Sequence, residues 1–318
     1  TYFLALAFGL SSLVALSTGT SWGTVGTAGI ALSGIGLGLG INPAMTAGAI
    51  LSGAYFGDKL SPLSDTTVLT ASLGEIDVMD HVRAMVPVTL MAFPLTMCSF
   101  YLVSRLVSSG TYDPAQVQEI TSALSNVYNI TPAAFIPPLI VMALLISRVS
   151  ALLGLTAGAF LGVIWALLFQ GVSMQTALIS LFKPEVQSTG VEVVDNVLAI
   201  GGFSYIFSPI AAVFLALGLG GLLQGLGIFD TIGNLIQKRM RTGGNLVLFT
   251  IILCFLGNVF TGALYPALIL TTKIMYKPTK RLGYHPSVMT QATETGGTLM
   301  SVMIPWTQGG LFMASILG

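Results

Sequence analysis

Charged side chains are scarce in this sequence, and their scarcity excludes several classes of protein. Lysine, arginine, aspartate and glutamate make up 8% of the chain, whereas soluble domains carry about 25%. The twelve basic residues only balance the twelve acidic ones, so no positive field is available to attract nucleic acid. Both cysteines, Cys98 and Cys254, lie in apolar runs, which provides neither a disulfide framework nor a metal-binding spacing. A soluble enzyme, a disordered tail protein and a nucleic-acid-binding protein are therefore excluded.

The abundant residues are apolar ones and glycine. Hydrophobic residues account for 54% of the 318 residues, and 37 residues are glycine. This composition is typical of a polytopic membrane protein, whose helices face lipid and pack closely on one another. The chain starts at Thr1 inside an apolar run and stops at Gly318 just after another, and no basic segment precedes Tyr2–Leu16. We therefore expect no signal peptide there, and a chain truncated at both ends.

Four apolar stretches are candidates for helices that cross the bilayer, which needs about 20 apolar residues. They are residues 84–107, 133–147, 151–169 and 199–223. Four further stretches are each divided by a polar string, and their apolar arms are too short for comfortable spanning. We interpret 1–40 and 245–273 as re-entrant hairpins, and 43–73 and 286–318 as broken transmembrane helices. Unwound backbone at membrane depth must be buried in protein or line a wet cavity, so the four polar strings point to one site.

The distribution of basic residues sets the expected topology. Each hairpin is expected to return to the side of the membrane from which it entered. Most lysines and arginines then fall on one face of the membrane, which is the cytoplasmic face. The order of hairpin and broken helix recurs in each half with opposite orientation. We therefore predict an all-α polytopic fold with an inverted-topology repeat, formed by residues 1–109 and 133–318 around an extracellular loop at 110–132. In such a fold the site lies near the membrane midplane, where the discontinuous helices meet.

Two carboxylates, Asp58 and Asp65, lie in the polar string of the first broken helix. A carboxylate inside a membrane is costly and points to a functional site. Its oxygens suit a small hard cation such as Na⁺, and a group that binds either a proton or Na⁺ couples their opposite movements. The alternatives are an ion pair between Asp58 and Lys59, and an Asp65 that caps the following helix. Lys59 itself is either a counter-ion or a residue that snorkels to the surface.

The other polar strings supply further candidate ligands. Glu294 lies at the corresponding break in the second half, where the alternative role is to stabilise a helix start. The candidates with hydroxyl or amide groups are Ser61, Ser64, Thr66, Thr67, Thr20, Ser21, Asn258, Thr261, Thr295 and Thr298. Taken singly, each of these short side chains is equally suited to satisfying nearby backbone. For His81 we expect a solvated helix face at the cytoplasmic edge, with pH sensing as the alternative.

Several strings resemble the NhaC family of Na⁺/H⁺ antiporters. Residues 53–67, GAYFGDKLSPLSDTT, look like that family's signature, and similar motifs follow its pattern at 18–26 (TGTSWGTVG), 294–298 (ETGGT) and 304–306 (IPW). The resemblance implies a secondary transporter that pairs re-entrant hairpins with broken helices and often works as a homodimer by an elevator-like motion. It also implies a family that includes Na⁺/H⁺ exchangers and coupled exchangers of small carboxylates, such as malate and lactate, and of amino acids.

The sequence departs from the family's pattern at two places. The family often has aspartate and serine where this chain has Thr295 and Gly296, and asparagine where Val68 follows Thr67. One carboxylate and one amide are therefore missing from the usual ligand set. Neither the stoichiometry nor the transported species needs to follow the family's Na⁺/H⁺ exchangers.

We predict a Na⁺/H⁺ antiporter of a prokaryotic plasma membrane that works by alternating access, with Asp58, Asp65 and Glu294 as ligands of Na⁺ or the proton. The alternative is a Na⁺- or H⁺-coupled antiporter of small organic anions or amino acids, for which the missing carboxylate at Thr295 makes room. We expect no cofactor, and the lipid bilayer, Na⁺ and H⁺ as partners. A channel fits less well because paired broken helices suit alternating access. An intramembrane enzyme fits less well because no nucleophile–base pair or metal-ligand cluster occurs.

Overall fold

The computed structural model describes residues 2–107, 114–147, 149, 151–183, 188–191 and 241–318, together with scattered positions from 195 to 231. Every regular element that these residues form is a helix, so the prediction of an all-α fold is confirmed for the described part of the chain. The chain divides into two compact units. The first holds Thr1–Ala54 and Thr96–Phe207, and the second holds Tyr55–Leu95 and Ser208–Ile316.

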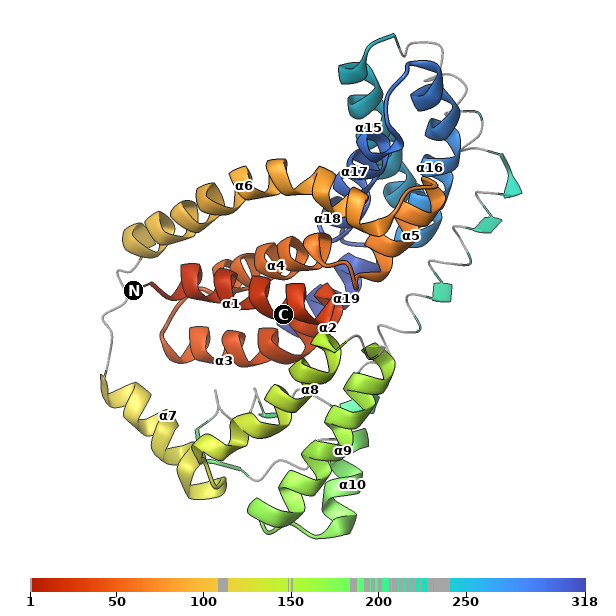
Figure 1. Cartoon of the computed structure of the whole chain (residues 1–318). Helices are drawn as coiled ribbons and strands as arrows, with labels where there is room; N and C mark the ends of the chain where they lie inside the picture. The colour runs from red at the N-terminus through yellow and green to blue at the C-terminus, as the bar shows by residue number, and fades with distance from the viewer. Residues whose placement is uncertain are drawn as a thin grey trace. The chain divides into compact units, whose positions relative to one another are not determined.

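The first unit consists mainly of short apolar helices. They are α1 (Phe3–Thr18), α2 (Ser21–Thr24), η1 (Val25–Gly29), α3 (Ile30–Gly38), α7 (Pro114–Val127), η2 (Pro132–Phe135), α8 (Ile136–Ile146), α9 (Ala151–Phe169), α10 (Met174–Phe182) and α12 (Gly202–Tyr205). Within this unit, α8 packs on α1 and α9, and α9 packs on α10 (Figure 1). The segment predicted as a loop, 110–132, contains the helix α7.

The polar string after α1 ends one helix and starts the next. Gly19 takes a left-handed conformation with φ of 69°, which glycine adopts without steric cost and which commonly ends a helix. Thr20 then caps α2, since its hydroxyl accepts a hydrogen bond of 3.2 Å from the backbone N–H of Gly23. The chain continues through η1 into α3, so the predicted hairpin 1–40 has helical arms on both sides of Gly19. Its re-entry into the membrane stays a prediction.

Two long helices belong to both units. α4 (Pro43–Leu60) begins in the first unit and ends in the second, whereas α6 (Val78–Val107) begins in the second and ends in the first. Where α4 packs on α1, a Cβ atom added to Gly53 would lie 2.2 Å from the carbonyl oxygen of Phe8. Only glycine therefore permits this close approach of the two backbones.

The second unit contains the helices that carry most of the predicted site. They are α5 (Asp65–Leu73), α15 (Gly243–Thr261), α16 (Leu264–Arg281), α17 (Pro286–Gly296), α18 (Thr298–Ser301) and α19 (Gln308–Leu317). α15, α16 and α17 pack on one another, and α5 packs on α16 and α17 (Figure 1). Leu246, Leu253, Met275 and Met289 form a buried apolar cluster between the three longer helices. This cluster packs α15, α16 and α17 together, and these helices carry many of the polar side chains of the predicted site.

The turn between α15 and α16 is tight and helical almost to its tip. Thr261 is the last residue of α15, and its hydroxyl donates to the carbonyl oxygen of Gly257 and accepts from the N–H of Ala263. Gly262 follows with a left-handed φ of 62°. The polar string 257–261 is therefore the last turn of a 19-residue helix, and the prediction of an arm too short to span was wrong. Among the described helices, α15 and α6 are long and apolar enough to cross a membrane.

The remaining predicted spans have helical counterparts only in part. The span 133–147 contains α8 and all of η2 except its first residue, Pro132, and 151–169 coincides with α9. About half of the span 199–223 lies outside the described residues, and its described part contains the short helix α12. The inverted-topology repeat stays a prediction.

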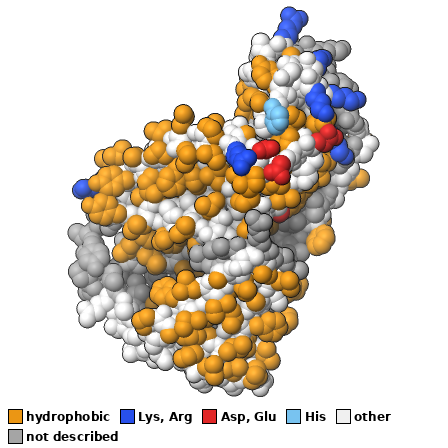
Figure 2. All heavy atoms as spheres, viewed as in Figure 1, with side chains coloured by type: hydrophobic (Ala, Val, Ile, Leu, Met, Phe, Trp, Pro, Cys, Tyr) orange, Lys and Arg blue, Asp and Glu red, His pale blue; other side chains and the backbone are white. Residues whose placement is uncertain are grey.

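The surface of the described helices carries many apolar side chains. Figure 2 shows them spread over the face of the molecule in view. On α6, Val88, Leu90, Met91 and Leu95 are all exposed. Exposed apolar surface of this extent is unusual for a soluble monomer and suits contact with lipid.

Candidate functional site

The site begins where α4 ends in the second unit. Asp58 and Lys59 lie on the last turn of α4 and are buried, with 3% and 4% of their surface exposed. Ser61 accepts a hydrogen bond from the N–H of Leu63 at 3.3 Å and so stabilises the turn that follows. Ser64 then caps α5, because its hydroxyl accepts from the N–H of Thr67. The two serines therefore hold a turn that keeps two charged side chains inside the protein.

Glu294 on α17 is the most deeply buried carboxylate of the described residues, with no exposed surface. The hydroxyl of Thr70 on α5 donates to its Oε1 atom at 2.9 Å. The hydroxyl of Thr298 on α18 donates to Oε2 at 2.5 Å. Buried carboxylates require partners of this kind, and here three helices supply the carboxylate and its two donors.

Lys59 reaches the same helix as Glu294. Its Nζ atom donates to the hydroxyl of Thr295 at 3.0 Å, and Lys59 and Glu294 are close enough to interact electrostatically. Lys59 takes part in neither of the ion pairs Arg83–Asp80 and Lys280–Glu75. The ammonium group is therefore held by a neutral hydroxyl, and the alternative of a close ion pair with Asp58 does not apply.

Asn258 joins α15 to the break between α17 and α18. Its Nδ2 atom donates to the carbonyl oxygen of Gly297 at 2.8 Å and to that of Gly296 at 3.4 Å. The Oδ1 atom is buried and has no hydrogen-bond partner among the described residues. A Cβ atom on Gly296 would lie 2.4 Å from the carbonyl oxygen of Ile251, so the two helices meet backbone to backbone. Asn258 of α15 thus hydrogen-bonds backbone carbonyl groups at the break between α17 and α18.

Asp65 has a different environment from Asp58. Its side chain is exposed on the second unit, where Oδ1 accepts from the N–H of Thr66 at 2.8 Å. The hydroxyl of Tyr265 on α16 donates to Oδ2. Asp65 is therefore the first residue of its helix and not its cap, which is Ser64. It is also tied to α16 through Tyr265, a residue that the sequence did not single out.

The other predicted ligands divide between the two units. Thr66, Thr67, Thr261 and Thr298 are buried in the second unit together with Ser61, Ser64, Asn258 and Glu294, and Thr295 is half-buried there. Thr20 and Ser21 belong to the first unit, at the start of α2. Three of the four polar strings are therefore brought together within one unit.

Two residues near Glu294 lay outside the sequence prediction. Thr70 continues the face of Thr66 and Thr67 at helical spacing, and that periodicity was the available signal. His81 was expected on a solvated face, and this was wrong, since it has no exposed surface and its Nδ1 lies 2.9 Å from the hydroxyl of Thr290 on α17. One turn beyond Thr290 on the same helix lies Glu294.

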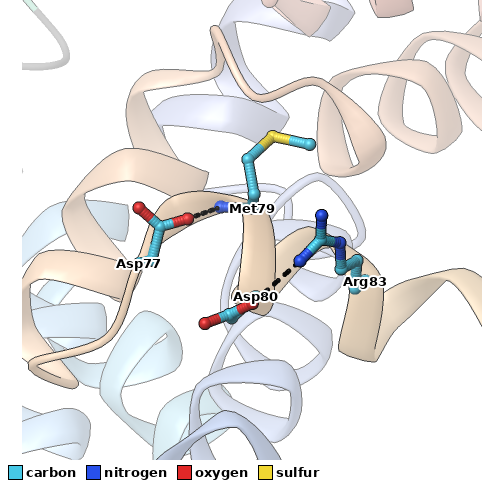
Figure 3. A network of polar contacts seen from close by, with 4 residues as sticks. All are labelled: Asp77, Met79, Asp80 and Arg83. Atoms are coloured by element: carbon cyan, nitrogen blue, oxygen red, sulfur yellow. Dashed lines mark hydrogen bonds and ion pairs between the residues drawn. The ribbon is translucent and has the colours of Figure 1, made fainter.

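The solvated face at the start of α6 is formed by the neighbours of His81. Asp77 accepts a hydrogen bond of 2.7 Å from the N–H of Met79, and Asp80 pairs with Arg83 at 3.2 Å (Figure 3). The side chains of Asp80 and Arg83 are more than half exposed. The side chains of Asp80 and Arg83 thus lie outside, whereas His81, which directly follows Asp80, turns inward.

Comparison with known proteins identifies the family. Residues 2–105 and 53–318 match the profile of the Na⁺/H⁺ antiporter family. The chain belongs to the Na⁺/H⁺ antiporter family. Antiporters of this family are transporters and not enzymes, and they are multi-pass proteins of the cell membrane, which agrees with the apolar helices described above. No solved structure matches the chain.

Three relatives differ in the activities that their names state. The chain is 42% identical to the malate-2H⁺/Na⁺-lactate antiporter of Bacillus subtilis over 99% of its own length and 68% of that protein. It is 35% identical to the arginine/ornithine antiporter ArcD of Halobacterium salinarum over 99% of its length and 66% of that protein. It is 33% identical to the Na⁺/H⁺ antiporter NhaC of Alkalihalophilus pseudofirmus over 96% of its length and 66% of that protein. This member of the antiporter family therefore spans about two thirds of the length of these relatives.

Proposed function

We propose that the chain is the core of a cation-coupled antiporter that exchanges a small organic carboxylate across the cell membrane, with Na⁺ and H⁺ as the coupling ions. The observation that carries this proposal is the buried Glu294, held by two hydroxyl donors, beside the equally buried Asp58 and Lys59. Charged side chains at membrane depth are costly and are retained where ions or charged substrates pass.

Na⁺ and the proton would compete for the buried carboxylates. Na⁺ prefers oxygen ligands, and the second unit offers carboxylate oxygens of Asp58 and Glu294 together with the Oδ1 atom of Asn258, which accepts no hydrogen bond from the described residues. Asp65, Ser61, Ser64, Thr66, Thr67, Thr261 and Thr298 are further ligands of the cation in this proposal, whereas Thr295 is left to the organic substrate. Thr20 and Ser21, which lie in the first unit, stay sequence predictions. A site that holds one cation at a time couples the opposite movements of the two.

An organic carboxylate as the exchanged species is supported by the relatives. Malate, lactate, arginine and ornithine, which appear in the names of the two relatives at 42% and 35% identity, all carry a carboxylate group. In the first of these names, each carboxylate is paired with a cation. Cation exchange without an organic substrate is the second candidate, and the relatives named NhaC favour it, at 33% and 32% identity.

A flux panel in everted membrane vesicles tests the proposal. The full-length protein is expressed, an acid-inside gradient is followed with a pH-sensitive dye, and Na⁺ is added alone or with malate, lactate or arginine. We expect the gradient to collapse only when one of the carboxylates accompanies Na⁺. Collapse by Na⁺ alone, unaffected by every carboxylate, would support the second candidate and overturn the first. Single-channel currents would overturn both.

A further inference from the structure

Lys59 is a buried cation whose described partner is neutral. Its ammonium group carries three N–H donors, and one of them is used in the 3.0 Å hydrogen bond to Thr295. In the part of the chain that the structure describes, Lys59 forms no ion pair within 4 Å. Burying an ammonium group without an opposite charge in contact is expensive. The position therefore favours a ligand that supplies a negative charge.

The neighbouring polar groups leave the ammonium donors available. The hydroxyl of Thr295 donates its own proton to the carbonyl oxygen of Gln291 at 2.9 Å, so it offers Lys59 only a lone pair. The oxygens of Glu294 are each engaged by a threonine hydroxyl at 2.9 Å or less. Glu294 thus acts on Lys59 through its field rather than through a shared hydrogen bond.

Access to Lys59 is provided by Thr295. Lys59 is 4% exposed, whereas the side chain of Thr295, with which it is hydrogen-bonded, is half-buried. A ligand that reaches Thr295 from outside the second unit therefore comes within reach of the ammonium group. Because charge-assisted hydrogen bonds between an ammonium and a carboxylate are short and strong, a single carboxylate is a suitable occupant.

We propose that Lys59 and Thr295 form the subsite that binds the carboxylate group of the transported organic anion. The inference deepens the proposed function and rests on it. The substrate oxygens accept from the two ammonium N–H groups that have no described partner, and Thr295 keeps the third N–H oriented. A cation bound at Glu294 removes the negative charge that faces Lys59, so the anion and the cation bind together.

The variant Thr295→Asp tests the subsite by supplying Lys59 with a carboxylate from the protein itself. The full-length protein is purified and reconstituted in nanodiscs, and binding of radiolabelled malate and lactate and of ²²Na⁺ is measured. We expect the dissociation constants for malate and lactate to rise at least tenfold, while ²²Na⁺ binding is retained. Lys59→Gln, which removes the charge with little change of volume, should weaken both anions to the same extent.

Lys280→Gln is the matched control, since Lys280 is exposed and pairs with Glu75 at 3.7 Å. We expect it to bind malate and lactate as the unaltered protein does. If the unaltered protein binds one of these anions and both Thr295→Asp and Lys59→Gln bind it equally well, the subsite is overturned and the proposed function stands. If the unaltered protein binds and transports neither these anions nor arginine, the proposed function fails, and the subsite fails with it. Should Thr295→Asp not fold, as judged by size-exclusion chromatography, Lys59→Gln decides alone.

Discussion

Thr70 donates a hydrogen bond of 2.9 Å to Glu294, although 224 residues separate the two in the sequence. Thr298 donates to the other carboxylate oxygen at 2.5 Å. All three side chains are buried, so the carboxylate is oriented by donors from two different helices. A cation that binds Glu294 meets a carboxylate that is already oriented. Binding therefore does not have to order this side chain, which would cost conformational entropy.

Replacing Thr70 by valine should weaken cation binding at Glu294. The substitution keeps the shape of the side chain and removes one donor to the carboxylate. A hydrogen bond to a charged group contributes about 1.5–3 kcal/mol, so we expect the half-saturating Na⁺ concentration to rise roughly tenfold or more. The Na⁺ dependence of dye-monitored flux in everted vesicles measures the change. Ser72→Ala, at an exposed position of the same helix, should leave it unaltered, and an unaltered value in Thr70→Val would remove Thr70 from the site.

Replacing Asp58 by asparagine should abolish the Na⁺-dependent response. The substitution removes the charge of a buried group with almost no change of volume, and an amide cannot exchange a proton for a cation. The matched control is Asp80→Asn, which breaks the exposed pair with Arg83 (Figure 3) that is worth about 0–1 kcal/mol. We expect the control to transport normally. Full activity of Asp58→Asn in the same assay would show that this carboxylate takes no part in coupling.

Local patterns predicted the segments of the site but not its contacts. The broken stretches 57–67, 257–261 and 293–298 were recognised from polar residues in apolar surroundings, and all three lie in the second unit. Thr70 could not be paired with Glu294, because a hydrogen bond across 224 residues leaves no periodic trace. Thr70 illustrates this limit. Its helical spacing from Thr66 and Thr67 could be read from the sequence, whereas its contact with Glu294 could not.

Helix ends were the other source of error. The polar residues of 257–261 suggested an unwound tip, yet Thr261 satisfies backbone groups on both sides of the turn and lets α15 continue to that residue. His81 was assigned to a solvated face because Asp77 and Asp80 are its neighbours. Its inward orientation depends on Thr290, which lies on a helix that the sequence of α6 does not specify.

His81 should be replaceable by a residue that keeps one donor, but not by an apolar one. The hydroxyl of Thr290 donates to the carbonyl oxygen of Ser287 at 3.2 Å, so we assign Nδ1 of His81 as the donor to Thr290. His81→Asn retains an N–H near that position, whereas His81→Leu leaves Thr290 without its donor. We expect His81→Leu to lower the free energy of unfolding by about 1–3 kcal/mol, and His81→Asn to lower it less. Thermal unfolding in detergent measures both.

The second histidine provides the control for that comparison. His285 is exposed and caps α17 by accepting a hydrogen bond from the N–H of Ser287 at 3.3 Å. Asparagine is an equally good cap, so His285→Asn should unfold at the temperature of the unaltered protein. Equal stability of His81→Leu and the unaltered protein would contradict a stabilising contact between α6 and α17.

Gly296→Ala should separate the two helices that hold Glu294 and Asn258 in place. The added methyl carbon would lie 2.4 Å from the carbonyl oxygen of Ile251 and 2.8 Å from its Cα atom, and backbone atoms cannot give way without moving α15 from α17. Overpacking of this kind costs about 1–3 kcal/mol, and we expect the Na⁺ response to be lost with it, because Glu294 lies on the displaced helix. Gly244→Ala, where nothing lies within 4 Å of the added carbon, should be as stable as the unaltered protein or slightly more stable. If Gly296→Ala matched Gly244→Ala in both thermal unfolding and Na⁺ response, the close backbone contact would have no role in the site.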